Sequence, residues 1–448
     1  MSKFKTAKTV RRLAAFAVIA SPLTAAMATN GMLMEGYGPI STGMGGASQS
    51  FDHGTAGMAQ NPATLGLMAD GTSRLDVSIG VLGPDVKASM TGMPTAKSGG
   101  TSYIMPALGF VKRSGAYTYG FGMFAQGGMG TEYEAGSFMG AGAPARSELG
   151  VGNVIFPVAY QVSPDLTVGA TLKFLWSSLD LTMAASGAQL AGLAQASGVA
   201  PTGNLGAVLP GLAGAPLARI SFSDDNKFTG AAKSTGFGAS LGATFRVNKE
   251  VMMGASYQFK SALGDMKTAA SAASITAPGT PFPGDKGKIT VIDFQMPSVF
   301  AVGASWQASP ALLLAADVKY IGWGDSMKSF KMRYDSAQMG GSVNFTMPQN
   351  WKDQTVLNLG AAWKANEQLT LRAGLNLADN PIPDMYVNPL FPATVKNHAT
   401  LGLGYKISPA GEFNASLAFA PNTSVTSGDG VTISHKQTNL QLMYSHSF

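Results

Sequence analysis

The sequence predicts an all-β fold, a transmembrane antiparallel β-barrel of about 14 strands with an N-terminal hatch, or plug, in its lumen. Three observations support this prediction: an export signal at the N-terminus, segments of about ten residues with alternating polarity, and connections that alternate between short and long. The expected division is a signal peptide over residues 1–28, a hatch over 29–72 and the barrel over 73–448.

The N-terminus has the three parts of a secretory signal. Five cationic residues come first, followed by an apolar run over 13–20 and by Ala26-Met27-Ala28, where cleavage is expected. The alternative, a membrane anchor, is disfavoured because the run is shorter than the roughly 20 residues of a spanning helix. Without these five positive charges the balance falls from 31 basic against 25 acidic residues to 26 against 25 (31 − 5 = 26), so no nucleic-acid partner is predicted.

Alternation with a period of two recurs along the rest of the chain. Leu75, Val77 and Ile79, for example, alternate with Asp76 and Ser78, which is typical of a wall with an apolar outer face. The segments read this way are 73–84, 101–112, 116–126, 151–162, 166–181, 234–247, 250–260, 289–307, 311–322, 356–364, 368–377, 398–407, 411–420 and 433–448. Their number is even, as expected of a single-chain bacterial barrel.

The connections support the same fold. Tight turns such as Ser163-Pro164-Asp165 alternate with long segments such as 182–233, which indicates short periplasmic turns and long outer loops. The last segment ends on Phe448, which is typical of the signal that the barrel-assembly machinery reads. The sequence therefore predicts a multi-pass β-barrel in a bacterial outer membrane.

Residues 29–72 do not alternate and are rich in glycine and methionine. Such a segment either hangs in the periplasm or folds into the lumen, and its apolar content favours the lumen. Small residues at predicted inward positions would leave room for it. These positions are Gly120, Gly122, Gly238, Gly242, Gly402 and Gly404.

One motif of this segment resembles a known family. Asn61-Pro62-Ala63, after the small residues 41–47, looks like the hatch of the FadL family of outer-membrane transporters of long-chain fatty acids and hydrocarbons. Residues 351–355, residues 375–383 and the terminal Phe448 extend the resemblance over the mature chain. The family implies capture at outer loops, a luminal pocket and lateral release through a gap at the third strand.

The resemblance also implies partners and a gap. The expected partners are a hydrophobic small molecule, outer-membrane lipid and lipopolysaccharide, and the barrel-assembly machinery, with the protein acting as a monomer. In the third strand, Gly127, Gly128 and Gly130 are the candidates for the gap. The alternative is an ordinary strand that ends in a glycine-rich loop.

Two further groups are candidates for substrate binding. The loop over 182–217 is apolar and nearly uncharged, so Leu190 and Leu193 are expected in a capture lid, unless the loop only packs on itself. A carboxylate substrate would need a luminal cation, for which Lys173 and Arg372 are candidates. The alternative is that these charges are solvated lumen residues. Long-chain fatty acids are the first expected substrate; aromatic or aliphatic hydrocarbons, or a general porin, are the alternatives.

The sequence does not favour an enzyme. Its only histidines, His53, His398, His435 and His446, are scattered among segments predicted to lie apart. No group of residues has metal-ligand spacing, and no glycine motif opens a helix, so neither a metal nor another cofactor is predicted. A porin is disfavoured because charged residues make up only 12% of the chain.

Overall fold

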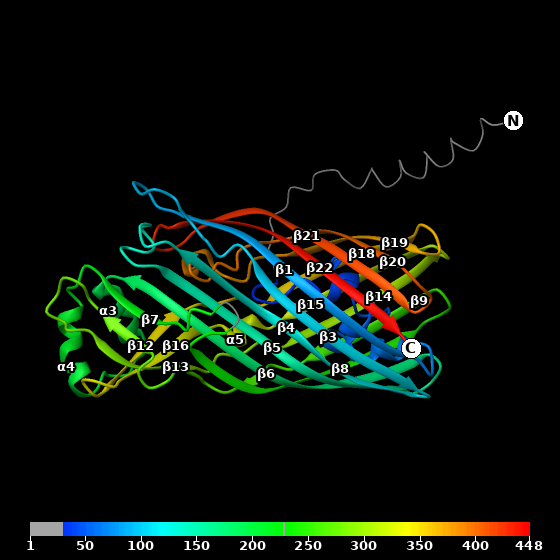
Figure 1. Ribbon diagram of the computed structural model, residues 1–448, viewed down its shortest axis with the longest axis horizontal. Coiled ribbons are helices and arrows are strands. Elements are labelled where there is room, and N and C mark those ends of the chain that lie inside the picture. Colours follow the sequence, from blue (N-terminus) through cyan, green and yellow to red (C-terminus); the bar gives the residue numbers. More distant parts are fainter. Residues whose placement is uncertain (1–29, 227–228) are drawn as a thin grey trace.

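The computed structural model describes residues 30–226 and 229–448, and it shows a tall, closed barrel (Figure 1). The predicted signal peptide lies outside the described residues. No helix among the described residues is long and apolar enough to span a membrane.

A closed ring of antiparallel strands forms the wall. Each strand pairs with the next, and β22 returns to pair with β1 from Arg74 opposite Ser447 to Ser89 opposite Thr432. The ring consists of β1 (Ser73–Ser89), β3 (Tyr103–Ser114), β4 (Tyr117–Tyr133), β5 (Ala145–Gln161), β6 (Leu166–Ala185), β8 (Ala232–Arg246), β9 (Val251–Gln258), β14 (Val299–Ser309), β15 (Leu312–Ile321), β18 (Gln354–Lys364), β19 (Leu369–Ala378), β20 (His398–Lys406), β21 (Gly411–Thr426) and β22 (Thr432–Ser447). Closure pairs the strand edges around the ring, apart from one local break between β3 and β4.

The expected number of about 14 strands is wrong: within the described residues the sheet has 18 strands of five residues or more. The long connections contain strands, because their backbone groups bond to one another and extend the wall outward. The additional elements are β2 (Ala96–Lys97), β7 (Ala218–Phe222), β10 (Ala262–Leu263), β11 (Met266–Lys267), β12 (Ala273–Thr276), β13 (Asp285–Ile292), β16 (Ser329–Ser336) and β17 (Ser342–Pro348). We call β7, β11, β12, β13, β16 and β17 the outer extension.

The predicted strand over 289–307 is in fact two strands with different neighbours. β13 ends at Ile292 and pairs with β16, whereas β14 begins at Val299 and pairs with β9 and β15. Between them Asp293 has a φ of 54°, and Pro297 lacks the amide hydrogen that a ladder needs. The alternation of apolar and polar residues in the sequence therefore continues across a point where the chain turns and changes its strand partners.

The short helices belong to two parts of the chain. In the N-terminal segment they are α2 (Gly38–Thr42), η2 (Thr55–Ala59) and η3 (Pro62–Leu67). In the long connections they are α3 (Gly187–Ala196), α4 (Gly203–Leu212), α5 (Trp323–Ser326) and η4 (Asp384–Tyr386). A capping box begins α3, since the Ser186 hydroxyl accepts from the Gln189 amide at 3.1 Å and the Gln189 side chain accepts from the Ser186 amide at 2.8 Å.

Residues 30–72, the N-terminal segment, lie against the inner face of strands all round the ring. The backbone amide of Ser48 donates to Asp317 of β15 at 2.6 Å, and that of Thr55 donates to Asp76 of β1 at 2.7 Å. The Asn61 side chain donates to the carbonyl of Ala243 on β8 at 3.1 Å. Most side chains of this segment are buried. That the segment acts as a plug stays a prediction.

Glycines on the inner face allow this close approach. At Gly254 of β9 an added Cβ would overlap the carbonyl oxygen of Gln49 in the N-terminal segment. We therefore expect Gly254→Ala to destabilise the folded protein by about 1–3 kcal/mol, because the backbone of the segment has to move away. The measurement is thermal denaturation followed by the gel mobility of folded and unfolded barrel. The control is Gly136→Ala, in an exposed turn with no atom within 4 Å of the new methyl group. Equal melting of the two variants would contradict this expectation.

Candidate functional site

The wall has a gap between β3 and β4. The two strands pair only from Ser114 opposite Tyr117 to Leu108 opposite Met123. Beyond that point residues 103–107 of β3 pair with β1, and β4 from Phe124 onward pairs with β5 and, through an isolated bridge at Gly127, with Leu33 of the N-terminal segment. Here, therefore, no backbone hydrogen bonds join the two strands, and we call this break the wall gap.

A bulge in β4 coincides with the wall gap. Its register with β5 shifts between Ala125 and Gly127, and the three predicted glycines, Gly127, Gly128 and Gly130, follow immediately. A bulge bends its strand, and glycine tolerates that bend and lets another backbone approach closely. That backbone is the N-terminal segment, since the amide of Gly128 donates to the carbonyl of Met32 at 3.2 Å.

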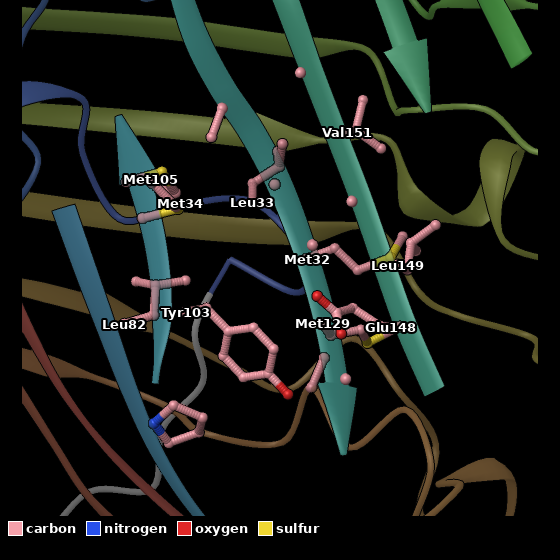
Figure 2. Close-up of a pocket in the computed structure, with 18 of the residues that line it drawn as sticks. Met32, Leu33, Met34, Leu82, Tyr103, Met105, Met129, Glu148, Leu149 and Val151 are labelled. Carbon is pink, nitrogen blue, oxygen red and sulfur yellow. The ribbon is translucent and has the colours of Figure 1, made fainter. Parts of the chain in front are cut away.

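A cavity of about 330 Å³ lies at the wall gap (Figure 2). Apolar side chains make up most of its lining, and they come mainly from the N-terminal segment, β1, β3, β4 and β5, with Trp176 of β6 and residues 392–395. They include Met32, Leu33, Met34, Leu82, Met105, Met129, Leu149 and Val151. All three predicted gap glycines also line it. Thioether side chains are flexible and polarisable, so the cavity can adapt to apolar molecules of different shape.

The cavity reaches from the interior of the barrel to its outer face. Leu82 and Leu149 face inward, whereas Ile104, Met123 and Trp176 face outward and are 49%, 40% and 37% exposed. The Trp176 ring lies against Gly152, where an added Cβ would overlap it. An apolar molecule in this cavity therefore has an opening toward the lipid-facing surface.

The charge of the cavity is negative or neutral. Its lining includes Glu35, Glu148 and His435, but no lysine or arginine among the described residues. Glu148 accepts from Arg146 at 2.6 Å, and Glu35 accepts from Asn439 at 3.2 Å. The arrangement suits an uncharged ligand, since a carboxylate would be desolvated beside other carboxylates without a cation of its own.

Neither predicted head-group cation lies at this cavity. The Lys173 ammonium is buried and donates to Gln258 at 2.6 Å. Arg372 donates to Asn414 at 2.9 Å and lies 3.8 Å from Glu412, at the opposite end of the barrel. Alternation predicts that both face inward. Arg372 has an acidic neighbour in Glu412, whereas the Lys173 ammonium donates to the uncharged amide of Gln258.

A second and larger cavity, of about 940 Å³, lies at the periplasmic end beyond the N-terminal segment. Its lining is rich in charge and includes Arg74, Arg246, Arg372, Glu250 and Glu412. The Arg74 guanidinium donates two hydrogen bonds, of 2.6 and 2.8 Å, to the Asp52 carboxylate of the N-terminal segment. Burial raises the pKa of Asp52, but Arg74 outweighs this and lowers it to about 2, so the carboxylate stays charged. Many charged groups line this vestibule, which makes it less suited to apolar solutes than the wall-gap cavity.

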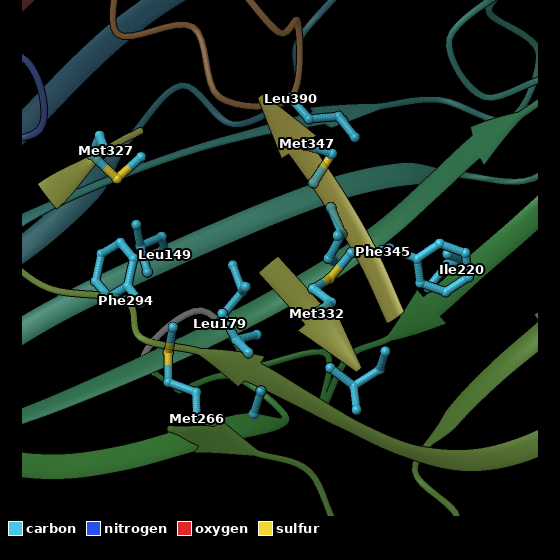
Figure 3. Close-up of a cluster of buried hydrophobic side chains, with 14 of the residues drawn as sticks. Leu149, Leu179, Ile220, Met266, Phe294, Met327, Met332, Phe345, Met347 and Leu390 are labelled. Carbon is cyan, nitrogen blue, oxygen red and sulfur yellow. The ribbon is translucent and has the colours of Figure 1, made fainter. Parts of the chain in front are cut away.

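An apolar cluster fills the barrel between the outer loops and the wall-gap cavity (Figure 3). It includes Ile220, Met266, Phe294, Met332, Phe345, Met347 and Leu390. Leu149 and Val151 belong both to this cluster and to the cavity lining, so the two are contiguous. The cluster also includes Leu190 of α3, while Leu193 packs against it half-buried. The two residues predicted for capture therefore lie in, or pack against, the same apolar cluster that reaches the cavity.

The predicted hatch residues lie away from the cavity, against β6 and β8. Asn61 donates to the carbonyl of Gln49 at 2.7 Å and accepts from the amide of Ala63 at 3.1 Å, which begins η3. Pro62 and Ala63 pass so close to Gly169 of β6 that a Cβ there would meet their backbone. These residues anchor the N-terminal segment, whereas Met32, Leu33 and Met34 of the same segment line the cavity. Sequence reasoning did not identify those three, since no pattern distinguished them from the other methionines.

Comparison with known proteins gives consistent results. A family model described as outer membrane protein transport protein (OMPP1/FadL/TodX) matches residues 16–447. The crystal structure of the Pseudomonas putida toluene transporter TodX is 32% identical and superposes with a TM-score of 0.83, covering 92% of this chain and 99% of that one.

Two other similarities differ in extent. The Ralstonia pickettii toluene transporter TbuX is 31% identical with a TM-score of 0.77, over 92% of this chain and 99% of that one. A curated protein from Chlorobium limicola, described as an uncharacterized protein in the phosphoenolpyruvate carboxykinase gene 5′ region, is 46% identical over 78 residues. That match spans 17% of this chain and only 38% of the relative, so it carries no functional argument.

Proposed function

Since this chain belongs to the FadL/TodX family of outer membrane transport proteins, we propose that its substrate is an uncharged hydrocarbon, most simply a single-ring aromatic compound. The coarser function follows from the family: the protein is a transporter of hydrophobic compounds in the outer membrane and is not an enzyme. The expectation of long-chain fatty acids is replaced here by the alternative that the sequence left open.

The observation that carries this proposal is the charge of the wall-gap cavity. Glu35 and Glu148 lie in its lining, and the described residues place no lysine or arginine there. A fatty acid carboxylate would lose its hydration without gaining a cationic partner, at a cost of several kcal/mol. A hydrocarbon has no charge to desolvate. The similar structures of TodX and TbuX, both titled toluene transporters, support the same substrate class.

The size of the cavity agrees with a small ligand. An apolar protein cavity of about 150 Å³ is enough to bind benzene, so the roughly 330 Å³ at the wall gap accommodates a substituted ring. The Tyr103 hydroxyl lines the cavity and has no hydrogen-bond partner among the described residues. It can therefore turn toward an aromatic face or a substituent.

The proposed route starts at the outer loops and ends in the membrane. The apolar face around Leu190 and Leu193 captures the solute, and the apolar cluster passes it inward to the cavity. Release then occurs sideways through the wall gap beside Gly127, Gly128 and Gly130. The N-terminal segment, anchored by Asn61, Pro62 and Ala63, acts as the hatch that closes the direct path. The polar vestibule beyond it is less suited to an apolar solute.

Uptake by cells tests this proposal. Cells that lack other family members and produce the protein should take up labelled toluene saturably, and labelled oleate no faster than cells without it. Uptake of oleate without uptake of toluene would contradict this proposal and support long-chain fatty acids as the substrate. Free diffusion of small ions through the purified protein in planar bilayers would favour a porin instead.

A cation placed in the cavity should reverse the preference. We expect Met105→Lys to lower toluene uptake about tenfold or more, because its ammonium must stay hydrated inside an apolar cavity. The same ammonium should raise binding of oleate by the purified protein, since it supplies the missing partner of the carboxylate. The matched control is Met252→Lys, which places the same group in the polar vestibule. Equal effects of the two variants on toluene uptake and oleate binding would contradict the proposal that the charge of the cavity determines the substrate.

A further inference from the structure

We propose that the outward face of the outer extension binds the phosphate groups of lipopolysaccharide. This face is the side of β11, β13 and β16 that points away from the barrel interior, and the adjoining end of β8 continues it. On β13, Ile289 and Val291 lie in the buried apolar cluster, so Lys286 and Lys288 point outward. On β16, Met332 and Tyr334 are buried, so Lys331 and Arg333 point outward in the same way.

Strand register brings these cations together. Lys267 of β11 lies opposite Lys233 of β8 on one side and Thr290 of β13 on the other. Thr290 in turn lies opposite Arg333 of β16. Because adjacent strands are about 4.8 Å apart, Lys267 and Arg333 flank Thr290 at roughly 10 Å from each other, and Lys288 is two residues along the middle strand. One phosphate-bearing head group can therefore reach several cations.

Most of these cations have no acidic partner. Lys233 lies 3.3 Å from Asp224, and Arg333 lies 2.7 Å from Asp335. In the described part of the chain no carboxylate lies within 4 Å of the ammonium groups of Lys267, Lys286, Lys288 or Lys331. Like charges directly opposite on neighbouring strands, as in Lys233 and Lys267, repel each other. A bound anion would remove that repulsion.

The height of the cations above the bilayer fits the outer leaflet. Phe237 points outward on the same strand as Lys233 and is 58% exposed, four residues nearer the membrane. Exposed aromatic side chains on neighbouring strands, Tyr257, Phe300 and Tyr320, continue an interfacial band. Four residues of strand span about 13 Å, which puts Lys233 beyond the apolar layer at the level of charged head groups. In the outer leaflet of this membrane, those groups are the phosphates of lipopolysaccharide.

The opposite charge prevails beside the wall gap. The outward positions of β4 and β5 there include Glu132 and Glu148, with Arg146 between their carboxylates at 3.6 and 2.6 Å. Phosphates are therefore attracted to the outer extension and repelled from the mouth of the gap. The proposed consequence is that lipopolysaccharide is anchored next to the protein without covering the lateral opening.

The test compares lipopolysaccharide bound to two variants of the full-length protein. The first replaces Lys267, Lys288 and Lys331 by glutamine. The control replaces Lys249, Lys364 and Lys406, three exposed lysines at the periplasmic turns, and so removes the same charge at the other end. Each protein is purified in detergent from outer membranes, its folding is checked by gel mobility, and its lipopolysaccharide is measured as bound sugar and phosphate.

We expect the first variant to retain at most about one fifth of the lipopolysaccharide that the control retains, and added salt to release it from the wild type. Equal amounts on both variants would overturn the proposal. For the wild type we also expect lipopolysaccharide micelles, but not phosphatidylglycerol micelles or inorganic phosphate, to raise the melting temperature. Equal stabilisation by all three would overturn the proposal of a lipopolysaccharide site and indicate a general anion site. This measurement uses the wild type alone, so it can be made even if a variant fails to fold.

Discussion

Replacement of Ala125 by tryptophan should lower the initial rate of toluene uptake at least about tenfold without unfolding the barrel. Ala125 lines the wall-gap cavity at the bulge of β4, on the outward side of that strand. An indole ring there would fill much of the cavity of about 330 Å³ and close its opening toward the lipid. Because the side chain points away from the packed interior, the cost to folding should be small.

The control for this variant is Ala255→Trp. Ala255 also faces outward, on β9 between the exposed Met253 and Tyr257, but it does not line the cavity. Uptake should be unchanged in this control, and both variants should show the gel mobility of a folded barrel. Wild-type uptake by the Ala125 variant would mean that the substrate does not pass the wall gap.

Replacement of Asp317 by alanine should open the barrel to ions. The Asp317 carboxylate accepts from the backbone amides of Ser48 and Gln49 at 2.6 and 3.2 Å. Its loss would leave two buried amides unsatisfied, at a cost of about 1–3 kcal/mol each, and remove the nearest countercharge of Lys319. The Lys319 ammonium itself donates to the carbonyls of Glu35 and Gly46. The N-terminal segment should therefore detach for part of the time.

The measurement is single-channel conductance in planar bilayers. The wild type should show few openings, and the Asp317 variant should show frequent ones, together with faster proteolysis of the N-terminal segment. Asp325→Ala is the control, because Asp325 is exposed and forms an ion pair with Lys260 outside the N-terminal segment. If the Asp317 variant opens no more often than the wild type, the result would contradict the proposal that the N-terminal segment acts as a hatch.

The sequence predicted the membrane-spanning strands well because their alternation has one physical cause, a wall with lipid on one side and packed side chains on the other. It predicted the outer extension poorly. The pattern over 289–307 continues through the turn at Asp293, and the two sides of that turn pair with different strands. Residues 261–288 have no long alternation, although β11 and β12 lie within them and both pair with β13. Pairings between distant segments leave little trace in the local sequence.

The candidate site was predictable only where a residue type had a backbone reason. Gly127, Gly128 and Gly130 were predicted to lie at a gap because glycine tolerates a break in the strand ladder, and the structure places them next to the bulge of β4. Lys173 and Arg372 were assigned to the inner face. Alternation does not reveal, however, that the Lys173 ammonium donates to Gln258 or that the Arg372 guanidinium lies near Glu412. The contribution of Met32, Leu33 and Met34 depends on where the N-terminal segment folds back, which no local pattern encodes.

The most direct test of the account is photolabelling of the intact wild-type protein with a diazirine-substituted benzene, followed by peptide mapping. The account predicts label on Met105, Met129 and Leu149 at the wall gap, with excess toluene competing for it. It predicts little label on Phe51 and Leu313, two of the apolar side chains that line the periplasmic vestibule. Competed label in the vestibule, with none at the wall gap, would contradict lateral release and favour passage along the barrel axis.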